Sequence, residues 1–453
     1  MDAYGPDATA TAAALAAQGR AAEAERWFRR ALAANGADTR AALGLARLLL
    51  HRQDLPGAVA VLRPAAAAAP HDPALFTAYR QFGLALFHGW YWEDAQPWLD
   101  RAVALAPWDE KLAALAARLR RPAYLTPEIR DPQLGRTLRR YAPRETEGYS
   151  FVIDIVGTCN LRCPTCPVGN STRGGRPIGF MEYGLFERIV EKIRAESPVP
   201  DPRISLFNWG EPLLHPELPR FLDLLHRHGL KSYLSSNLNI RHGLEAAIRA
   251  NPTDLKISIS GFSQAHYGRT HVRGQVELVK RNMRLIREVI DRHGLSTHVW
   301  VGHHLYRSSA HEMEPLRQLC AELGFDHSPI QAQYMPLERL AELLDGAAPA
   351  DPAIVADLPV PPPERQARIN AVRSGRYDCE LRFSQTVINH DGQVALCCAV
   401  YDADNMLGTS FLEHDLAALE RRKYAHPFCA TCIGRNLHHA PAELFPGEPL
   451  PGL

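Results

Sequence analysis

Apolar residues in the first third of the chain recur at the spacing of amphipathic helices. Stretches such as Glu23–Leu32 and Trp92–Leu105 combine Ala, Leu, Trp and Phe with charged residues in a helical period. Two such stretches form a unit, and successive units close at Asp38, Asp72 and Asp109, which are 34 and 37 residues apart. A helix pair repeated at this period predicts a stacked array of helical repeats. An Ala-rich helical bundle without true repeats is the alternative, since small-residue helices imitate one another.

The middle of the chain alternates short β-type runs with longer amphipathic stretches. This alternation predicts βα units, a parallel sheet of the α/β class and functional loops at the carboxyl ends of the strands. The predicted strands are Phe151–Val156, Arg203–Asn208, Lys231–Ser235, Leu255–Ser260 and His298–Val301, and the predicted helices include Tyr183–Arg194, Glu217–His228, Gln275–Arg292 and Glu312–Gly324.

Polar residues stand in or after these predicted strands. Asp154 interrupts the apolar run from Phe151 to Val156, and an acid in a buried strand needs a partner. We expect a structural salt bridge there, with a role in substrate or proton handling as the alternative. His303, His304 and Tyr306 follow the last predicted strand and are candidates to touch a substrate.

Two Pro-rich segments divide the chain further. A Pro/Arg-rich connector precedes the sheet region, and Leu358–Glu364 separates it from a short Cys- and His-bearing segment. The expected organisation is helical repeats at 1–120, a linker at 121–147, the α/β core at 148–350, a Pro-rich linker at 351–374, a small domain at 375–440 and a tail at 441–453.

Composition and charge exclude several classes of partner. The 453 residues carry 51 Lys plus Arg and 50 Asp plus Glu, so the net charge of +1 gives no reason to expect nucleic acid or an anionic membrane. No apolar run reaches the length of a transmembrane helix, and the first residues show no signal peptide. We therefore expect a cytoplasmic protein, in which nine cysteines indicate metal or redox chemistry.

Three of these cysteines directly follow the first predicted strand. Cys159, Cys163 and Cys166 lie within eight residues, on a loop where their thiols can converge. A 4Fe–4S cluster takes one thiolate at each iron, so three cysteines leave one iron open for another ligand. A structural zinc site would need a fourth ligand, and the residues after Cys166 supply none nearby. Chance clustering of buried cysteines is the remaining alternative.

The Cys-x3-Cys-x2-Cys spacing after a first strand resembles the signature of the radical S-adenosylmethionine (radical SAM) superfamily. The segment Asn208–His215, with its Gly-Glu pair, resembles the superfamily's next motif. The resemblance implies a partial (β/α)6-type parallel barrel, a 4Fe–4S cluster and S-adenosylmethionine. It departs at Thr165, where the superfamily commonly has an aromatic residue near the adenine. The residues implied to bind S-adenosylmethionine are Gly210 and Glu211 for its amino group, Ser235, Asn237, Ser258 and Ser260 for its carboxylate or ribose, and Arg273 for its carboxylate.

A second group of cysteines lies near the end of the chain. Cys379 precedes an expected hairpin with a turn at His390–Gly392, Cys397 ends that hairpin, and Cys429 and Cys432 form a Cys-x2-Cys pair. Four thiolates suit either a second 4Fe–4S cluster or tetrahedral zinc. The arrangement resembles the twitch and SPASM auxiliary-cluster domains of radical SAM enzymes, and the cysteine count fits the shorter, one-cluster twitch-like form. The period of the N-terminal units likewise resembles tetratricopeptide repeats.

Two cysteines remain outside both groups. The spacing from Gly392 selects Cys397 as the ligand and leaves Cys398 free beside the cluster. Cys398 is then either a small buried hydrophobe or a hydrogen-atom donor that quenches a substrate radical, as an epimerase needs. Cys320 lies on an amphipathic stretch and is expected in the core.

The resemblance implies an enzyme that cleaves S-adenosylmethionine reductively to a 5′-deoxyadenosyl radical, which abstracts a hydrogen atom from the substrate. An external donor such as a flavodoxin or ferredoxin supplies the electron. We expect oxidation, crosslinking or epimerisation of a peptide or protein, with the repeats binding a protein partner. One alternative is dehydrogenation or epimerisation of a small polyol, aminosugar or related metabolite. Another is a non-catalytic scaffold stabilised by metal.

Overall fold

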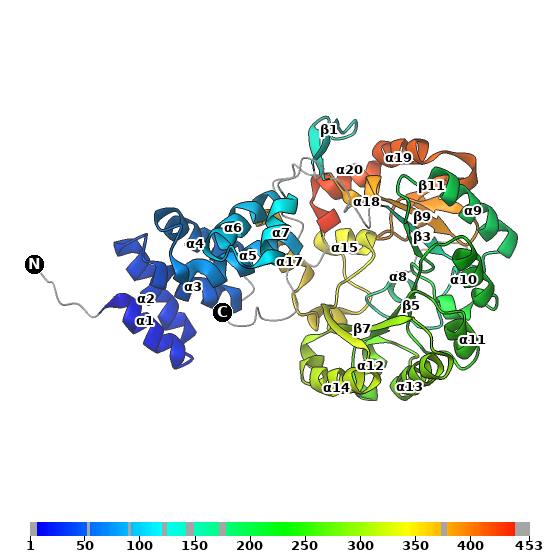
Figure 1. Cartoon of the computed structure of the whole chain (residues 1–453), viewed down its shortest axis with the longest axis horizontal. Coiled ribbons are helices and arrows are strands. Elements are labelled where there is room, and N and C mark those ends of the chain that lie inside the picture. Colours follow the sequence, from blue (N-terminus) through cyan, green and yellow to red (C-terminus); the bar gives the residue numbers. More distant parts are fainter. Residues whose placement is uncertain are drawn as a thin grey trace, which may run out of the picture. The chain divides into compact units, whose positions relative to one another are not determined.

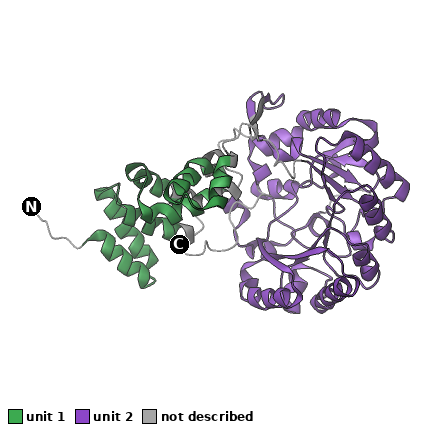
Figure 2. Cartoon of the chain, in the orientation of Figure 1, with its two compact units in different colours: residues 1–124, 367–373, 442–453 green, residues 125–366, 374–441 purple. Residues whose placement is uncertain are grey.

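The chain divides into two compact units, which Figure 2 shows in different colours. The first comprises residues 1–124, 367–373 and 442–453, and the second comprises 125–366 and 374–441. The computed structural model describes residues 7–51, 55–88, 92–119, 125–141, 149–171, 178–372 and 378–439. The tail expected at 441–453 lies outside the described residues. No helix in these ranges is both long and apolar enough to cross a membrane.

The first unit is built from paired helices. α1 packs against α2, α3 against α4, and α5 against α6. Its buried positions are largely Ala, and Gly44 permits a close approach, because a Cβ there would lie 2.2 Å from the Phe28 ring. The helices are α1 (Ala8–Ala17), α2 (Ala21–Ala34), α3 (Thr39–His51), α4 (Leu55–Ala68), α5 (Phe76–His88), α6 (Trp92–Leu105) and α7 (Glu110–Leu119).

The regularly spaced aspartates begin the helix pairs of this unit. Asp38 accepts a hydrogen bond from the Ala41 backbone N–H at 2.9 Å, and Asp109 accepts one from Leu112 at 3.0 Å. Asp72 accepts one from Ala74 at 2.9 Å. Each carboxylate thus satisfies a backbone N–H that the first turn of the helix leaves without a partner. The repeat predicted from these residues is therefore marked by N-caps, and Asp7 caps α1 in the same way.

The second unit contains one nine-stranded sheet (Figure 1). Its order is β11-β10-β9-β3-β4-β5-β6-β7-β8, and β3 to β8 are parallel and follow chain order. This confirms the α/β class and the parallel (β/α)6-type core, but the described strands form no closed barrel. The six strands are β3 (Ser150–Asp154), β4 (Arg203–Ser205), β5 (Ser232–Ser236), β6 (Asp254–Ile259), β7 (His298–Leu305) and β8 (Asp326–Gln331).

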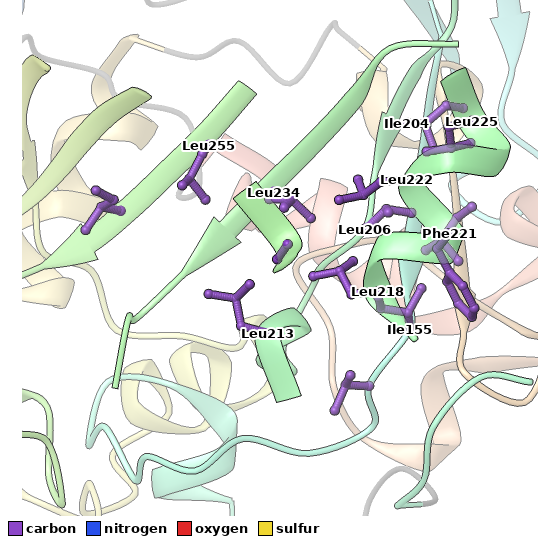
Figure 3. Close-up of a cluster of buried hydrophobic side chains, with 14 of the residues drawn as sticks. Ile155, Ile204, Leu206, Leu213, Leu218, Phe221, Leu222, Leu225, Leu234 and Leu255 are labelled. Carbon is purple, nitrogen blue, oxygen red and sulfur yellow. The ribbon is translucent and has the colours of Figure 1, made fainter. Parts of the chain in front are cut away.

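One face of this sheet is apolar and packs against helices. Alternate residues such as Ile204, Leu234 and Leu255 point into a core shared with Phe221 and Leu225 of α10 (Figure 3). The opposite, inner face is more polar, since Ser235, Lys256 and Ser258 on β5 and β6 are half-buried. The helices on the apolar face include α9 (Tyr183–Glu196), α10 (Leu218–Arg227), α11 (Leu244–Arg249), α13 (Val276–His293) and α14 (Met313–Leu323).

The predicted strands and helices of the core are confirmed within a few residues, and one strand of the parallel sheet was not predicted. β8 was not predicted, because Asp326–Gln331 has neither an apolar run nor a regular alternation and contains Pro329. β8 is held in the sheet by its parallel pairing with β7, which its side-chain pattern does not predict.

The C-terminal cysteine segment extends the same sheet. The expected hairpin is present as β9 (Gln385–Asn389) and β10 (Gln393–Ala395), and β11 (Met406–Ser410) follows. β9 pairs in parallel with β3, so Ser150 lies opposite Gln385 and Asp154 opposite Asn389. The short elements of this segment are α18 (Glu380–Phe383), α19 (Leu416–Ala425) and α20 (Pro427–Gly434).

The two segments expected as linkers contain regular structure. The first holds a hairpin of β1 (Leu125–Arg130) and β2 (Thr137–Tyr141), whose Leu138 packs with Cys379 and Ile433. The second holds α16 (Pro352–Ala356) and α17 (Pro362–Val372). Proline at the first position of a helix costs no hydrogen bond, so the Pro-rich composition there marks helix starts.

His298 bonds two aspartates and so links the amino ends of β6, β7 and β8. His298 contacts Asp254 at 2.7 Å and Asp326 at 2.9 Å, and these hydrogen bonds raise the pKa of His298. Because the pKa of His298 is higher in the folded protein than in the unfolded chain, where it is near 6.5, protonated His298 stabilises the fold below about pH 6.5. This stabilisation is lost as the pH rises through the pKa of the folded state. Since His298 is half exposed, its contribution to the free energy of unfolding stays below about 1 kcal/mol.

We therefore expect His298→Gln to lower the urea midpoint at pH 5.5 and to leave it nearly unchanged at pH 8.5. His293→Gln, at an exposed position near the end of α13, is the control. An equal loss at both pH values would contradict the assignment.

Candidate functional site

The first three cysteines lie on the loop between β3 and the short helix α8 (Pro167–Asn170). The loop folds tightly: the Cys166 N–H donates to the Cys163 carbonyl at 3.0 Å, and α8 approaches so closely that a Cβ on Gly169 would lie 2.1 Å from that oxygen. The cysteines are half-buried. Burial raises the pKa of Cys159 to about 11, of Cys163 well above its usual range, and of Cys166 to about 12. Charge on Glu211 adds to the rise for Cys159, and charge on neighbouring cysteines adds to the rises for Cys163 and Cys166. Three thiols are thus gathered where burial favours the neutral form and a bound cation would favour thiolates.

Asn237 and Glu211 join this loop to the ends of β4 and β5. The Asn237 side-chain amide donates to the Cys159 Sγ at 3.5 Å and to the Asn160 Oδ1 at 3.0 Å. The Asn237 backbone N–H donates to Glu211 at 2.8 Å, and the Leu213 N–H donates to the same carboxylate at 3.1 Å. Burial raises the pKa of Glu211 to about 7. Glu211 therefore contacts Asn237, and Asn237 in turn contacts Cys159.

Gly210 is held between two backbone segments. A Cβ at this position would lie 1.7 Å from the Val156 carbonyl oxygen. The carboxylate of Asp154 accepts the backbone N–H groups of Asn208, Trp209 and Gly210, each at 3.2 Å. The structural interpretation of Asp154 is confirmed, but its partners here are backbone amides where we expected a salt bridge.

The remaining predicted S-adenosylmethionine contacts fall into two groups. Ser235 and Ser258 are neighbours on the inner face, with their hydroxyl oxygens 3.3 Å apart. Ser260 is fully buried and bonds the Nδ1 of His271 at 2.7 Å, so its hydroxyl serves the packing behind the strand end. Arg273 is exposed and has a positive φ of 74°, in a loop where the Val272 carbonyl accepts the N–H of Arg162, between the first two cysteines.

Tyr306, directly after β7, contacts the cysteine loop. The Tyr306 hydroxyl lies 3.1 Å from that of Thr165, and Tyr306 is 4% exposed. An aromatic residue distant in sequence thus adjoins the position where the superfamily commonly has its own. His303 is buried, with its Nδ1 3.2 Å from the Nε2 of His327, and burial lowers its pKa to about 4. Burial also lowers the pKa of His304, so both histidines are neutral at pH 7.

Two residues near the site were missed by sequence reasoning. The indole N–H of Trp209 donates to the Val400 carbonyl at 2.9 Å, which connects the Gly-Glu loop to the C-terminal segment. The Tyr267 hydroxyl accepts from the Asn239 amide at 2.6 Å, and Tyr267 is fully buried near the cysteines. The position of Trp209 next to Gly210 in the sequence could have indicated that Trp209 lies near the site. Nothing in the sequence indicates that Tyr267 does.

The second cysteine group is also assembled by the fold. Cys379 caps α18, Cys397 follows β10, and Cys429 and Cys432 lie one turn apart on α20. Burial raises the pKa of all four thiols. Negative charge on Cys398, and then on Cys379 and Cys429, further raises the pKa of Cys397, and charge on Cys379 and Cys429 raises that of Cys432. The four thiols therefore lie within electrostatic range of one another. Among the described residues no group of three or more His, Cys, Asp or Glu side chains is placed to hold a single metal ion.

Cys397 and Cys398 contact different parts of the structure. Cys397 packs against the main core, which includes Cys429. Cys398 packs with Met406 against Val152, Val387 and Ala395, which form a separate small cluster. This placement favours Cys397 as the member of the four-cysteine group. Cys320 is fully buried in the main core, as predicted.

Comparison with known proteins agrees with this geometry. Residues 153–313 match the sequence profile of the Radical SAM superfamily, and residues 15–82 match a tetratricopeptide repeat profile. Residues 153–313 are thus similar to the Radical SAM superfamily, whose members are enzymes that use a 4Fe–4S cluster and S-adenosylmethionine, and residues 15–82 are similar to tetratricopeptide repeats. The cysteine loop and the Gly-Glu segment both lie within residues 153–313.

Individual relatives are distant. A 7,8-dihydro-6-hydroxymethylpterin dimethyltransferase from Methanocaldococcus jannaschii is 30% identical over 120 residues, which are 25% of this chain and 23% of that protein. The chain thus spans about a quarter of this curated relative. Streptococcus suis SuiB bound to S-adenosylmethionine is 14% identical, with a TM-score of 0.42, over 86% of this chain and 82% of that one. The anSMEcpe structure with bound AdoMet is 13% identical, with a TM-score of 0.41, over 61% and 82%.

Proposed function

We propose that this protein is a radical SAM enzyme that oxidises, crosslinks or epimerises a peptide or protein substrate, with a 4Fe–4S cluster on Cys159, Cys163 and Cys166 and an auxiliary 4Fe–4S cluster on Cys379, Cys397, Cys429 and Cys432. When bound, the first cluster and S-adenosylmethionine supply reductive cleavage of a carbon–sulfur bond and a carbon radical able to take a hydrogen atom from an unactivated C–H bond. The cofactors carry the difficult chemistry, and the protein orients the reacting groups.

The observation that carries the proposal is the connected set Cys159, Asn237, Glu211 and Gly210. The amide of Asn237 donates to a cysteine sulfur and so favours its thiolate form. Asp154 and Glu211 fix the backbone of the Gly-Glu loop and of residue 237 beside that cysteine. We assign the S-adenosylmethionine amino group to this loop, the carboxylate or ribose to Asn237, Ser235 and Ser258, and the carboxylate partner to Arg273. Ser260, whose buried hydroxyl bonds His271, supports the end of β6 behind these residues.

The four-cysteine group supports a fully ligated auxiliary cluster. Its donors are four thiols gathered in one electrostatic environment, which is the ligand chemistry that iron–sulfur clusters take. An auxiliary cluster can accept the substrate electron in an oxidation or a crosslink. Cys398, which packs apart from the main core, is the candidate hydrogen donor for an epimerisation.

The peptide or protein substrate is supported by the repeat segment, because tetratricopeptide repeats bind protein segments in an extended groove. The alternative is a small polyol, aminosugar or related metabolite, and the pterin named for the curated relative is also a small molecule. A flavodoxin or ferredoxin is the proposed electron donor. Formation of 5′-deoxyadenosine above the substrate-free rate, with short peptides or with a metabolite panel, distinguishes the two substrate classes.

The proposal is tested on anaerobically reconstituted protein with dithionite and S-adenosylmethionine. We expect 5′-deoxyadenosine by mass spectrometry, about eight iron and eight sulfide per chain, and loss of the nucleoside in Cys163→Ser. Cys320→Ser is the control, because Cys320 lies in the core. Wild-type protein that yields no nucleoside would overturn the enzyme assignment, and about four iron with one zinc would overturn the auxiliary cluster. Cys398→Ala tests the donor: undiminished turnover with both clusters intact would reject that role.

A further inference from the structure

A buried lysine stands beside the second cysteine group. Lys423 lies on α19, is 1% exposed and is one of the largest fully buried side chains of the protein. Its ammonium donates to the backbone carbonyls of Leu381, at 3.3 Å, and Gln385. These carbonyls follow Cys379 along the chain, so the ammonium is fixed next to the segment that carries one of the four cysteines.

The negative groups within electrostatic range of Lys423 are mainly these cysteines. Thiolate charge on Cys397, Cys429 and Cys379 raises the pKa of Lys423 and opposes the lowering caused by burial. Glu420 is the carboxylate in range, but among the described residues Lys423 forms no ion pair within 4 Å. Burial lowers the pKa of Lys423 overall, and the carbonyls that accept from its ammonium are neutral, so they do not offset its positive charge.

The other buried cation of this region is paired with carboxylates. Arg382 is 3% exposed and pairs with Asp131 at 2.6 Å and with Asp378 at 3.2 Å. Its charge lowers the pKa of Cys379, Cys429 and Cys432, but two carboxylates face the same guanidinium, and charge on Asp378 raises the pKa of Cys379 and Cys429. An unpaired buried charge is costly, so its retention at Lys423 calls for a negative partner.

We propose that Lys423 is the counter-charge of the auxiliary iron–sulfur cluster and sets its reduction potential higher than the four thiolates alone would. This inference rests on the proposed function, which assigns that cluster to Cys379, Cys397, Cys429 and Cys432. Four thiolates leave a buried cluster with net negative charge, and one more electron adds to it. A fixed ammonium in the same low-dielectric region favours the reduced form. In the one-electron reduction the electron enters the cluster, and Lys423 neither gains nor loses a bond.

The test is a redox titration followed by electron paramagnetic resonance. It uses the full chain with Cys159, Cys163 and Cys166 all changed to Ala, so that only the auxiliary cluster gives a signal. In this background we expect Lys423→Met to move the midpoint potential to a more negative value at unchanged iron content, and Lys423→Arg to keep it near the parent value. Lys280→Met is the matched control, because Lys280 on α13 is another buried lysine and lies over the ring of Phe262. We expect no shift of the midpoint potential in this variant.

Each outcome of the titration either supports or overturns the role of Lys423 as a counter-charge. An unshifted potential in Lys423→Met with full iron would overturn the role of Lys423 and leave the auxiliary cluster standing. Loss of iron in Lys423→Met that Lys423→Arg restores supports the counter-charge, whereas loss in both variants shows a packing role and overturns it. A background protein without iron would remove both the auxiliary cluster and this inference. S-adenosylmethionine cleavage by the unmodified chain is measured separately and does not depend on this result.

Discussion

Gly210→Ala is expected to abolish formation of 5′-deoxyadenosine, or to reduce it at least tenfold. The added methyl group would lie 1.7 Å from the Val156 carbonyl oxygen and 3.0 Å from Asp154 Oδ1. The first of these atoms belongs to the backbone that leads into the cysteine loop, so it cannot rotate away. The Gly-Glu loop must move, and the hydrogen bonds that Asp154 accepts from residues 208 to 210 are lost with it. We expect a stability loss of about 1–3 kcal/mol from overpacking.

The measurement is 5′-deoxyadenosine yield per chain, with iron content determined on the same sample. Gly184→Ala is the matched control, because a Cβ there meets nothing within 4 Å and the residue lies in the first turn of α9. This control is expected to keep full activity and to be neutral or slightly more stable. Wild-type activity in Gly210→Ala would show that the loop has no part in binding S-adenosylmethionine.

Arg382→Met is expected to destabilise the second unit by roughly 3–5 kcal/mol, the usual cost of leaving buried charges unpaired. Arg382 bridges Asp131, beside the β1–β2 hairpin, and Asp378, next to Cys379. Its guanidinium also stacks 3.6 Å from the centre of the Tyr424 ring, and the Tyr424 hydroxyl donates to Asp378. Removal of the guanidinium leaves two buried carboxylates that repel each other, while methionine keeps most of the volume.

Urea unfolding followed by tryptophan fluorescence measures this loss. Arg317→Met is the control, since it breaks an exposed ion pair with Glu314 on α14 and is expected to change stability by less than about 0.5 kcal/mol. Addition of Asp131→Asn to Arg382→Met is expected to recover part of the loss, because one of the two unpaired charges disappears. A loss in Arg382→Met no larger than in the control would contradict a charge-balanced network.

The sequence predicted the parts of this protein that rest on local pattern. Strands with apolar alternation, such as Leu255–Ser260, and helices with a strong apolar face, such as Gln275–Arg292, are found within two residues of their expected limits. The position of three cysteines directly after a predicted strand likewise located the cysteine loop that follows β3. Local periodicity sufficed because each of these elements buries its own apolar face.

What the sequence could not give depends on contacts between distant residues. Asp154 reads as a lone acid in an apolar run, and only the fold brings three backbone amides to it. The pairing of β9 with β3 joins segments more than two hundred residues apart, and no local pattern signals it. The same holds for Lys423, whose charged side chain on a helix is ordinarily exposed but is here enclosed by the cysteine segment.

The position of β9 bears on how the chain is made. Without β9, β3 would be the edge of the parallel core, with a row of unpaired backbone groups open to other chains. The partner strand ends at Asn389, so during synthesis this edge stays uncovered until most of the chain has left the ribosome. Pairing across so long a loop is also slow. The nascent protein is therefore expected to be prone to aggregation until β9 has been made, and to depend on chaperones over that interval.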